Sequence, residues 1–292
     1  MEQGGWAAKE DRVVRIELAK LQDGLRSWAR KYSREAVNSD LEKVSTPEED
    51  KIVEELKGYC VQTNWCSLLE QMPISSNKVF SVFIQALLAK DVFDNIFPDP
   101  FFAFPETVDD SKLPNRAEMR LLYQTMAQLN KKEAQIWRSH MMRVLSAYPS
   151  GDKGSLMSDR LQRMASSHAK ALINGPAHIF LRDPENQAEV IRRSDDLHRL
   201  YHQAGGLALS LWTQRTVIES YGLQRLHEFS SSSSLMTAHR LYHLDEDDKR
   251  LDGKKILLCV QPTVLAFGNE NAEDYDNSKV WAKAIVLLEG DM

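Results

Sequence analysis

Residues 79–89 read VFSVFIQALLA, a strongly apolar stretch that decides the fold class. On a helix spanning 76–94, apolar side chains cover most of the circumference, and Gln85 interrupts them. A helix that is apolar on nearly all sides normally lies at the centre of a helical bundle. Because the stretch is too short to span a bilayer, we expect it to form the core of a soluble helical protein.

Apolar residues at steps of three and four predict further helices around this central one. The predicted ranges are 11–36, 46–72, 115–147, 155–173 and 184–222. In the last of these, Gly205 and Gly206 predict a kink or a break. Residues 96–105 carry four phenylalanines in a segment rich in proline, so we expect an aromatic loop inserted into the bundle.

Near the C-terminus the apolar pattern changes from that of helices to that of strands. Residues 255–267 and 280–288 are rich in Ile, Leu and Val, and polar residues separate them. We expect an antiparallel pair, with Pro262 at an edge or a bulge because proline has no N–H to donate. The predicted fold is mainly α: a single domain over 1–292, an irregular multi-helix bundle with a C-terminal antiparallel β-hairpin (254–290) packed on it.

The first helix carries an apolar stripe close to coiled-coil spacing. Its members alternate steps of four and three: Val14, Leu18, Leu21, Leu25, Trp28 and Tyr32. The stripe spans under three heptads and Gly24 interrupts it, so an independent coiled coil would be marginal. We expect its C-terminal half to pack into the bundle. We expect residues 1–20 to project, so that Val14, Leu18 and Leu21 bind a protein partner or a second copy.

Composition and charge limit the classes of function. The chain is 42% hydrophobic and 27% charged, which is ordinary for a globular protein, and its net charge of −5 gives no reason to expect nucleic acid or an anionic membrane. Three cysteines do not make a disulfide framework. With no signal peptide visible, we expect an intracellular protein, cytoplasmic or nuclear.

Three groups of residues suggest a family. They are LRSWA at 25–29; VFIQAL at 82–87 with DPFF at 99–102; and QPTV at 261–264 with FGNE at 267–270 and Tyr275. Together they resemble a group of uncharacterised helical-domain proteins of filamentous ascomycete fungi. The resemblance implies a helical fold over nearly the whole chain, and it carries over no catalytic residue.

The pentapeptide HRLYH occurs twice, at 198–202 and at 239–243. Two histidines four residues apart on a helix can ligate one metal ion, with Asp195 or Asp245 as further ligands. The candidate metal ligands are His198, His202, His239 and His243. Alternatively, leucine and tyrosine face the core while the histidines are solvated. Because no glutamate follows the first histidine, neither copy is H-E-x-x-H, and we expect no metal.

A basic segment near the end of the first helix also carries aromatic residues. It consists of Arg26, Trp28, Arg30, Lys31, Tyr32 and Arg34. One interpretation is a surface for phosphate or for a partner. The other, which we favour, is a solvated basic face whose aromatic side chains point to the core.

No nucleophile motif or phosphate loop is recognisable in the sequence. The leading hypothesis is a non-enzymatic protein-interaction or scaffold module without a cofactor. The alternatives are an enzyme with a pocket inside the helical bundle, and a metal-binding protein that uses the two HRLYH segments. A pocket lined by titratable groups with shifted pKa values would favour the enzyme. A large exposed apolar patch would favour the interaction module.

Overall fold

The computed structural model describes residues 7–35, 46–74, 76–106, 114–146, 156–226, 228–245 and 248–290. The α-helices are α1 (Asp11–Tyr32), α3 (Thr46–Glu55), α4 (Trp65–Gln71), α5 (Ser76–Asn95), α6 (Arg116–Leu129), α7 (Lys131–Ser146), α8 (Leu156–Asn174) and α9 (Gln187–Trp212). The 3-10 helices are η1 (Pro176–Phe180), η2 (Leu223–Arg225) and η3 (Arg240–Tyr242). The strands are β1 (Val217–Tyr221), β2 (Met236–Ala238), β3 (Ile256–Gln261), β4 (Thr263–Phe267), β5 (Ser278–Ala282) and β6 (Ala284–Leu288).

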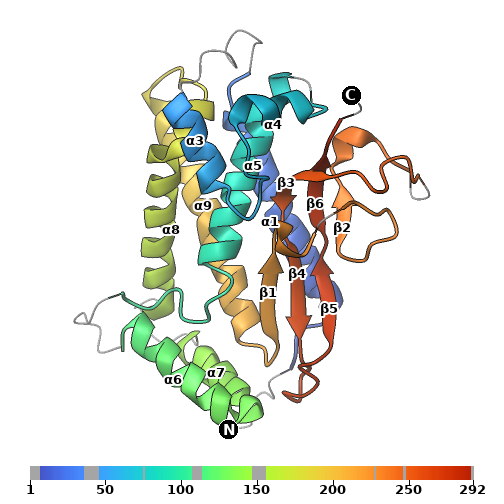
Figure 1. Ribbon diagram of the computed structural model, residues 1–292. Coiled ribbons are helices and arrows are strands. Elements are labelled where there is room, and N and C mark those ends of the chain that lie inside the picture. The colour runs from blue at the N-terminus through green and yellow to red at the C-terminus, as the bar shows by residue number, and fades with distance from the viewer. Residues whose placement is uncertain are drawn as a thin grey trace.

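The apolar helix α5 lies in the interior, as predicted. It packs against α1 and against β3. In Figure 1, α8 and α9 stand on one side of α5, the strands stand on the other, and the α6–α7 pair lies across one end. Phe80, Phe83 and Leu88 are completely buried, as expected for a helix surrounded by other elements. In the described part of the chain, no helix is both long and apolar enough to cross a membrane.

The prediction of a mainly α fold with one β-hairpin is wrong. Of the residues that the structure describes, about 56% are helical and 14% are in strands or bridges, so the fold is mixed. The strands form two three-stranded sheets, in the orders β1-β4-β5 and β2-β6-β3. The sequence predicts two strand regions near the C-terminus. Each is divided into two strands, β3 and β4 in the first and β5 and β6 in the second. β1 and β2 lie outside both regions.

The predicted antiparallel pair is present, and it belongs to both sheets. Pro262 divides its first strand into β3 and β4, and Lys283 divides its second into β5 and β6. β3 pairs with β6 and β4 pairs with β5, in both cases antiparallel. The pairing register shifts between Cys259 and Gln261 and again between Val264 and Leu265, so the predicted bulge at Pro262 is confirmed. β3 is also an edge strand of its sheet.

The helix predicted over 184–222 is too long. α9 ends at Trp212, and β1 follows it and pairs antiparallel with β4. α9 also runs unbroken through Gly205 and Gly206, so the predicted kink is wrong. A Cβ on Gly205 would lie 2.5 Å from Met164 Cε of α8. Gly205 therefore permits the close packing of α8 on α9.

Two other predicted helices are each divided in two. The range 115–147 contains α6 and α7, which meet at Asn130, where the side chain accepts a hydrogen bond from Glu133 N at 3.2 Å. Asparagine favours such a capping position over the interior of a helix. The range 46–72 contains α3 and α4, and between them Gly58 has a φ of 86°, a conformation that glycine adopts without strain.

The first helix does not project. Val14 and Leu18 are completely buried and Leu21 is 5% exposed, so the apolar stripe is covered by the rest of the chain along its whole length. α1 packs on α5, α9 and β5. The core of this chain therefore covers the apolar stripe that we expected a protein partner to bind.

The aromatic loop is inserted into the interior, as predicted. Phe97, Phe101, Phe102 and Phe104 are all at least 94% buried. Phe101 meets Phe104 edge to face, with ring centroids 5.5 Å apart, and meets Tyr123 of α6 in the same way at 5.9 Å. The loop thereby joins the α6–α7 pair to the main body.

Candidate functional site

A groove with a volume of about 990 Å³ lies where the end of α1, the start of α5 and the residues around η3 meet. Basic side chains dominate its described lining: Arg26, Arg30, Lys31, Arg34, Lys78, Arg182 and Arg240. Glu35 is the only carboxylate among the described lining residues. We refer to this feature as the basic groove.

The basic segment on α1 has its aromatic side chains in the core, as we favoured, and its role as a binding surface stays a prediction. Trp28 and Tyr32 are 4% and 1% exposed and face the core, and the Tyr32 hydroxyl donates to Asp196 Oδ2 at 2.6 Å. Arg26 and Arg30 are one helical turn apart and line the basic groove. The 3.6-residue period therefore separates the aromatic residues from the cations.

Local helix energetics do not account for all of this charge. Cations in the last turn of a helix interact favourably with its dipole, which explains Arg30 and Lys31 at the end of α1. Lys78 lies near the start of α5, where that preference is reversed. Arg182 and Arg240 come from loops and from η3. Four separate parts of the chain thus bring positive charge to one place.

Some of these cations are neutralised within the protein and others are not. Arg26 pairs with Asp23 at 2.7 Å, Lys31 pairs with Asp196 at 2.7 Å, and Arg182 pairs with Glu189. Within the described ranges, no carboxylate pairs with the other four lining cations, which are Arg30, Arg34, Lys78 and Arg240.

The unpaired cations raise the positive potential of the basic groove. Partial burial, and then the charges of Arg26 and Arg30, lower the pKa of the Arg240 guanidinium. Arg34 lies over the Phe80 ring at 4.7 Å, and its buried Nε has no hydrogen-bond partner among the described residues. Like charges held this close repel one another, and an anion bound between them would relieve that repulsion.

Two buried polar side chains, Gln85 and His239, also line the basic groove. Gln85 is 3% exposed, and its amide makes no hydrogen bond within the described part of the chain. The residue that interrupts the apolar stretch of α5 therefore lines this groove, together with Lys78, Ser81 and Val82 of the same helix. Because no atom of the Gln85 amide is both fully enclosed and without a partner, the amide is open to the groove, where a ligand or water can satisfy it.

His239 presents a hydrogen-bond donor to the basic groove. Its Nδ1 accepts from Leu241 N at 3.3 Å, so in the neutral imidazole the proton lies on Nε2. Burial, and then the charges of Arg240, Arg26 and Lys78, lower the pKa of His239 to about 4. The ring is therefore neutral at pH 7, and none of the described residues accepts a hydrogen bond from Nε2.

The two HRLYH segments have different structures. The first lies on α9, where the rings of His198 and His202 stack with centroids 6.4 Å apart. The second forms η3, with His239 buried at its start and His243 exposed at its end in a left-handed conformation. No three side chains of His, Cys, Asp or Glu come together as a metal site in the described residues. The absence of a metal stays a prediction.

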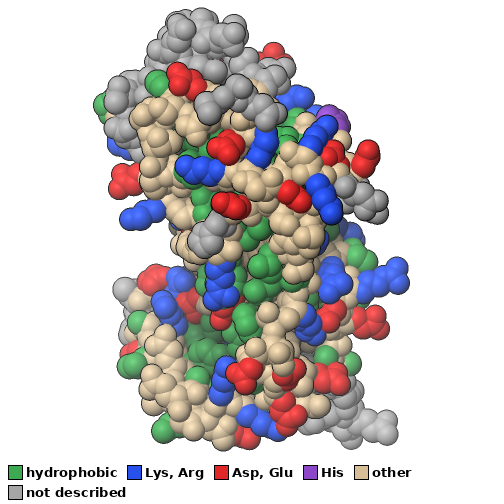
Figure 2. Space-filling view, turned by 45° about the vertical axis from the view of Figure 1, so that its right-hand side comes forward, with side chains coloured by type: hydrophobic (Ala, Val, Ile, Leu, Met, Phe, Trp, Pro, Cys, Tyr) green, Lys and Arg blue, Asp and Glu red, His purple; other side chains and the backbone are tan. Residues whose placement is uncertain are grey.

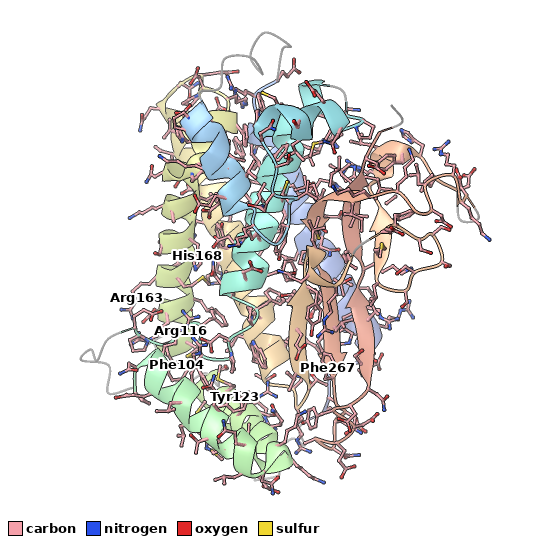
Figure 3. The ribbon with its side chains drawn as sticks, viewed as in Figure 1. Phe104, Arg116, Tyr123, Arg163, His168 and Phe267 are labelled. Carbon is pink, nitrogen blue, oxygen red and sulfur yellow. The ribbon has the colours of Figure 1, made fainter. Side chains whose placement is uncertain are left out.

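A second hollow, of about 590 Å³, separates the α6–α7 pair from β1 and β4. Figure 2 shows hydrophobic side chains gathered in a hollow across the middle of this face, with charges of both signs around it. In Figure 3, Tyr123 of α6 and Phe267 of β4 lie on opposite sides of it. Leu121, Leu122 and Leu129 on the same helix are exposed. Aromatic and glutamine side chains line this hollow without a concentration of one charge.

No protein-family model, no curated protein and no solved structure matches the chain. The site must therefore be interpreted from its own geometry.

The sequence indicated only part of the basic groove. The cations of α1 were visible as a cluster, and Gln85 was visible as an interruption. No local sequence pattern indicates that Lys78, Arg182 or Arg240 belongs to this groove, because each looks like an ordinary surface charge until the fold brings it next to α1. His239 was noticed as a candidate metal ligand, and the structure places it among cations, where a metal ion would be repelled.

Proposed function

We propose that this protein is an interaction module that binds a phosphorylated segment of a partner protein in the basic groove. The observation that carries the proposal is the arrangement of Arg30, Lys78 and Arg240, without carboxylate partners, around the buried donors Gln85 and His239. Arginine clusters are the usual means by which proteins recognise phosphorylated motifs. The net charge of −5 does not oppose this, because the positive charge is local.

The dimensions of the groove favour a peptide over a lone phosphate ion. A volume of about 990 Å³ is far larger than a phosphate group requires. Val82 and Leu241 give the lining apolar surface on which neighbouring side chains of a peptide can pack. Gln85 and the His239 Nε2–H are neutral donors suited to a phosphate oxygen or to peptide carbonyls.

The experiment compares a degenerate phosphoserine peptide pool with the same pool unphosphorylated, by fluorescence anisotropy on the full chain. We expect the phosphorylated pool to bind at least tenfold more tightly, which corresponds to about 1.4 kcal/mol. Lys78→Gln should weaken that binding about tenfold, within the range for a hydrogen bond to a charged group. Lys170→Gln, an exposed lysine of α8 outside the groove, is the matched control and should change nothing.

Two results would overturn the proposal. Equal binding of both peptide pools would show that the groove does not recognise phosphate. Tight binding of inorganic triphosphate, with no phosphopeptide bound, would assign the groove to a small polyanion. The circular dichroism spectrum of each variant checks that the fold is retained.

Two expectations accompany this proposal. A reducing, cytoplasmic or nuclear location is supported by the three cysteines, which are all free. Kinship with the fungal helical-domain proteins rests on the sequence resemblance alone. Aligning the chain with sequences of those proteins tests it: Gln85, Arg30, Lys78 and Arg240 at the corresponding positions would support kinship, and their absence would count against it.

A further inference from the structure

A smaller cavity of about 260 Å³ lies between α6, α8 and the aromatic loop. Arg116, Arg160 and Arg163 line it together with His168 and Phe104. In Figure 3, His168 and Arg163 lie along α8, with Arg116 at the start of α6 and Phe104 of the aromatic loop next to them. We call it the His168 pocket. It shares no lining residue with the basic groove, so its assignment is independent of the proposed function.

A partly buried network of hydrogen bonds holds the His168 ring in one orientation. His168 Nδ1 lies 3.0 Å from Asp91 Oδ2 and 3.1 Å from Oδ1. The same carboxylate accepts hydrogen bonds from the Tyr201 hydroxyl at 2.6 Å and from Asn95 Nδ2 at 2.7 Å. Asp91 thus links α5, α8 and α9 through three donors. Such a carboxylate fixes both the direction and the tautomer of a histidine.

The tautomer follows from the charge of Asp91. Burial raises the pKa of this carboxyl group, but the hydrogen bond and the charge of His168, together with the hydrogen bonds from Tyr201 and Asn95, lower it more, so the net shift is downward. The carboxylate is therefore ionised at neutral pH and accepts the proton of His168 Nδ1. With the proton on Nδ1, the neutral form of the ring has Nε2 as a hydrogen-bond acceptor. This is the opposite of His239, whose Nε2 is a donor.

The surroundings of His168 define the kind of ligand. The Arg116 guanidinium forms ion pairs with Asp99, from Nε at 2.5 Å, and with Glu106, from Nη1 at 2.9 Å. Arg163 has no carboxylate partner in the described ranges. The pocket therefore offers positive charge and one acceptor nitrogen. Phe102, Phe104 and Met164 add an apolar wall. A peptide does not fit in 260 Å³, whereas a molecule of a few carbon atoms does.

We propose that the His168 pocket binds a small organic anion that carries a hydroxyl group, a phosphate ester or a carboxylate of about three carbon atoms. The arginines bind the anionic group, and His168 Nε2 accepts a hydrogen bond from the hydroxyl. Asp91 is a positioning residue that acts through His168. A fixed imidazole acceptor beside a bound hydroxyl has the geometry of a general base.

The test follows the ¹⁵N resonances of the histidine rings during titration with glycerol phosphate, and in parallel with propyl phosphate, which lacks the hydroxyls. Lactate and propionate form the carboxylate pair. His168→Gln assigns the signal. We expect the hydroxylated member of at least one pair to shift His168 Nε2 and to bind about tenfold more tightly than its partner compound. Arg163→Gln should weaken both members of that pair alike.

Asp91→Asn tests whether Asp91 positions the His168 ring for the ligand or only supports the fold. It should remove the preference for the hydroxylated compound while leaving the affinity for its partner compound within twofold. Lys78→Gln, in the basic groove, should leave the His168 titration unchanged. Equal affinities within both pairs in the unaltered protein would overturn the acceptor role of His168. The absence of any His168 shift with all four probes would overturn the site, whether or not Asp91→Asn folds.

Discussion

Arg138 of α7 carries a buried positive charge, and replacing it by methionine tests how much that burial costs. The residue is completely buried, and its guanidinium lies over the Trp212 ring at 4.7 Å. Nη2 donates to Gln214 O and to Thr216 O, each at 3.0 Å. Nε and Nη1 have no hydrogen-bond partner in the described part of the chain.

The cost follows from the pKa. Burial lowers the pKa of Arg138 well below that of the free side chain, to about 10. A shift of this size corresponds to roughly 3 kcal/mol of destabilisation of the charged form. Because the pKa in the folded state is lower than in the unfolded chain, this cost is fully present below pH 10 and declines only as the pH rises above about 10.

Arg138→Met removes the charge and keeps most of the volume of the side chain. It also removes two hydrogen bonds from a charged donor to carbonyl groups, each worth about 1.5 kcal/mol. The gain and the loss nearly cancel, so we expect the stability at pH 7 to stay within about 1 kcal/mol of the unaltered protein, in line with other replacements of buried ions by apolar residues. Urea denaturation followed by circular dichroism measures the difference.

Arg138→Ala is the matched comparison. It removes the charge and also the stem that packs on Trp212, so it should destabilise the fold by about 2–4 kcal/mol through the cavity that remains. A methionine variant less stable than the unaltered protein by more than about 1 kcal/mol would refute the reasoning. It would mean that the guanidinium is satisfied by a group other than the two carbonyls.

Three further predictions concern packing and pH. Phe101→Ala should cost about 3–4 kcal/mol, because the ring is completely buried against Phe104 and Tyr123; a loss under 1 kcal/mol in chemical denaturation would contradict the inserted loop. Gly205→Ala puts a Cβ 2.5 Å from Met164 Cε and 2.9 Å from Leu161 Cδ2, so it should be less stable by about 1 kcal/mol or more than its control Gly206→Ala, where a Cβ meets nothing within 4 Å and alanine favours the helix equally. The pKa of His239 is about 4 in the fold against 6.5 for the free side chain, so the unfolded chain binds the proton first and stability falls as the pH drops from 6.5 to 4. His239→Gln should flatten this part of the stability profile by up to roughly 3 kcal/mol, and an unchanged profile would show that the ring is already accessible to protons.

The features that the sequence predicted well are those set by local pattern. The apolar surface of α5 follows from its own residues, so its burial could be predicted. The four phenylalanines of residues 96–105 are too apolar to stay exposed to solvent, and all four are buried. The antiparallel pair near the C-terminus was visible in two runs of Ile, Leu and Val, and Pro262 marked the bulge correctly. In each case the residues themselves carry the reason for the structure.

The features that were missed depend on distant partners. β1 continues from α9 with only a short connection, and it is a strand because Val217 pairs with Phe267, far along the chain. Asn130 can end a helix or sit within one, and the packing of α6 and α7 decides between them. The basic groove is an extreme case, since Arg30, Lys78 and Arg240 become one site only after α1, α5 and η3 have met.

The divided antiparallel pair has a consequence for the order in which the molecule assembles. β1 and β2 leave the ribosome before the strands that they bond to, β4 and β6. Until β3, β4, β5 and β6 have been synthesised, nothing covers the side of α5 that packs against β3. The middle strands of the two sheets, β4 and β6, are also missing until then. A single late hairpin, bent at Pro262 and Lys283, then completes both sheets at once. The nascent protein is therefore most exposed to aggregation just before that hairpin emerges, and a chaperone would find its binding surface on α5.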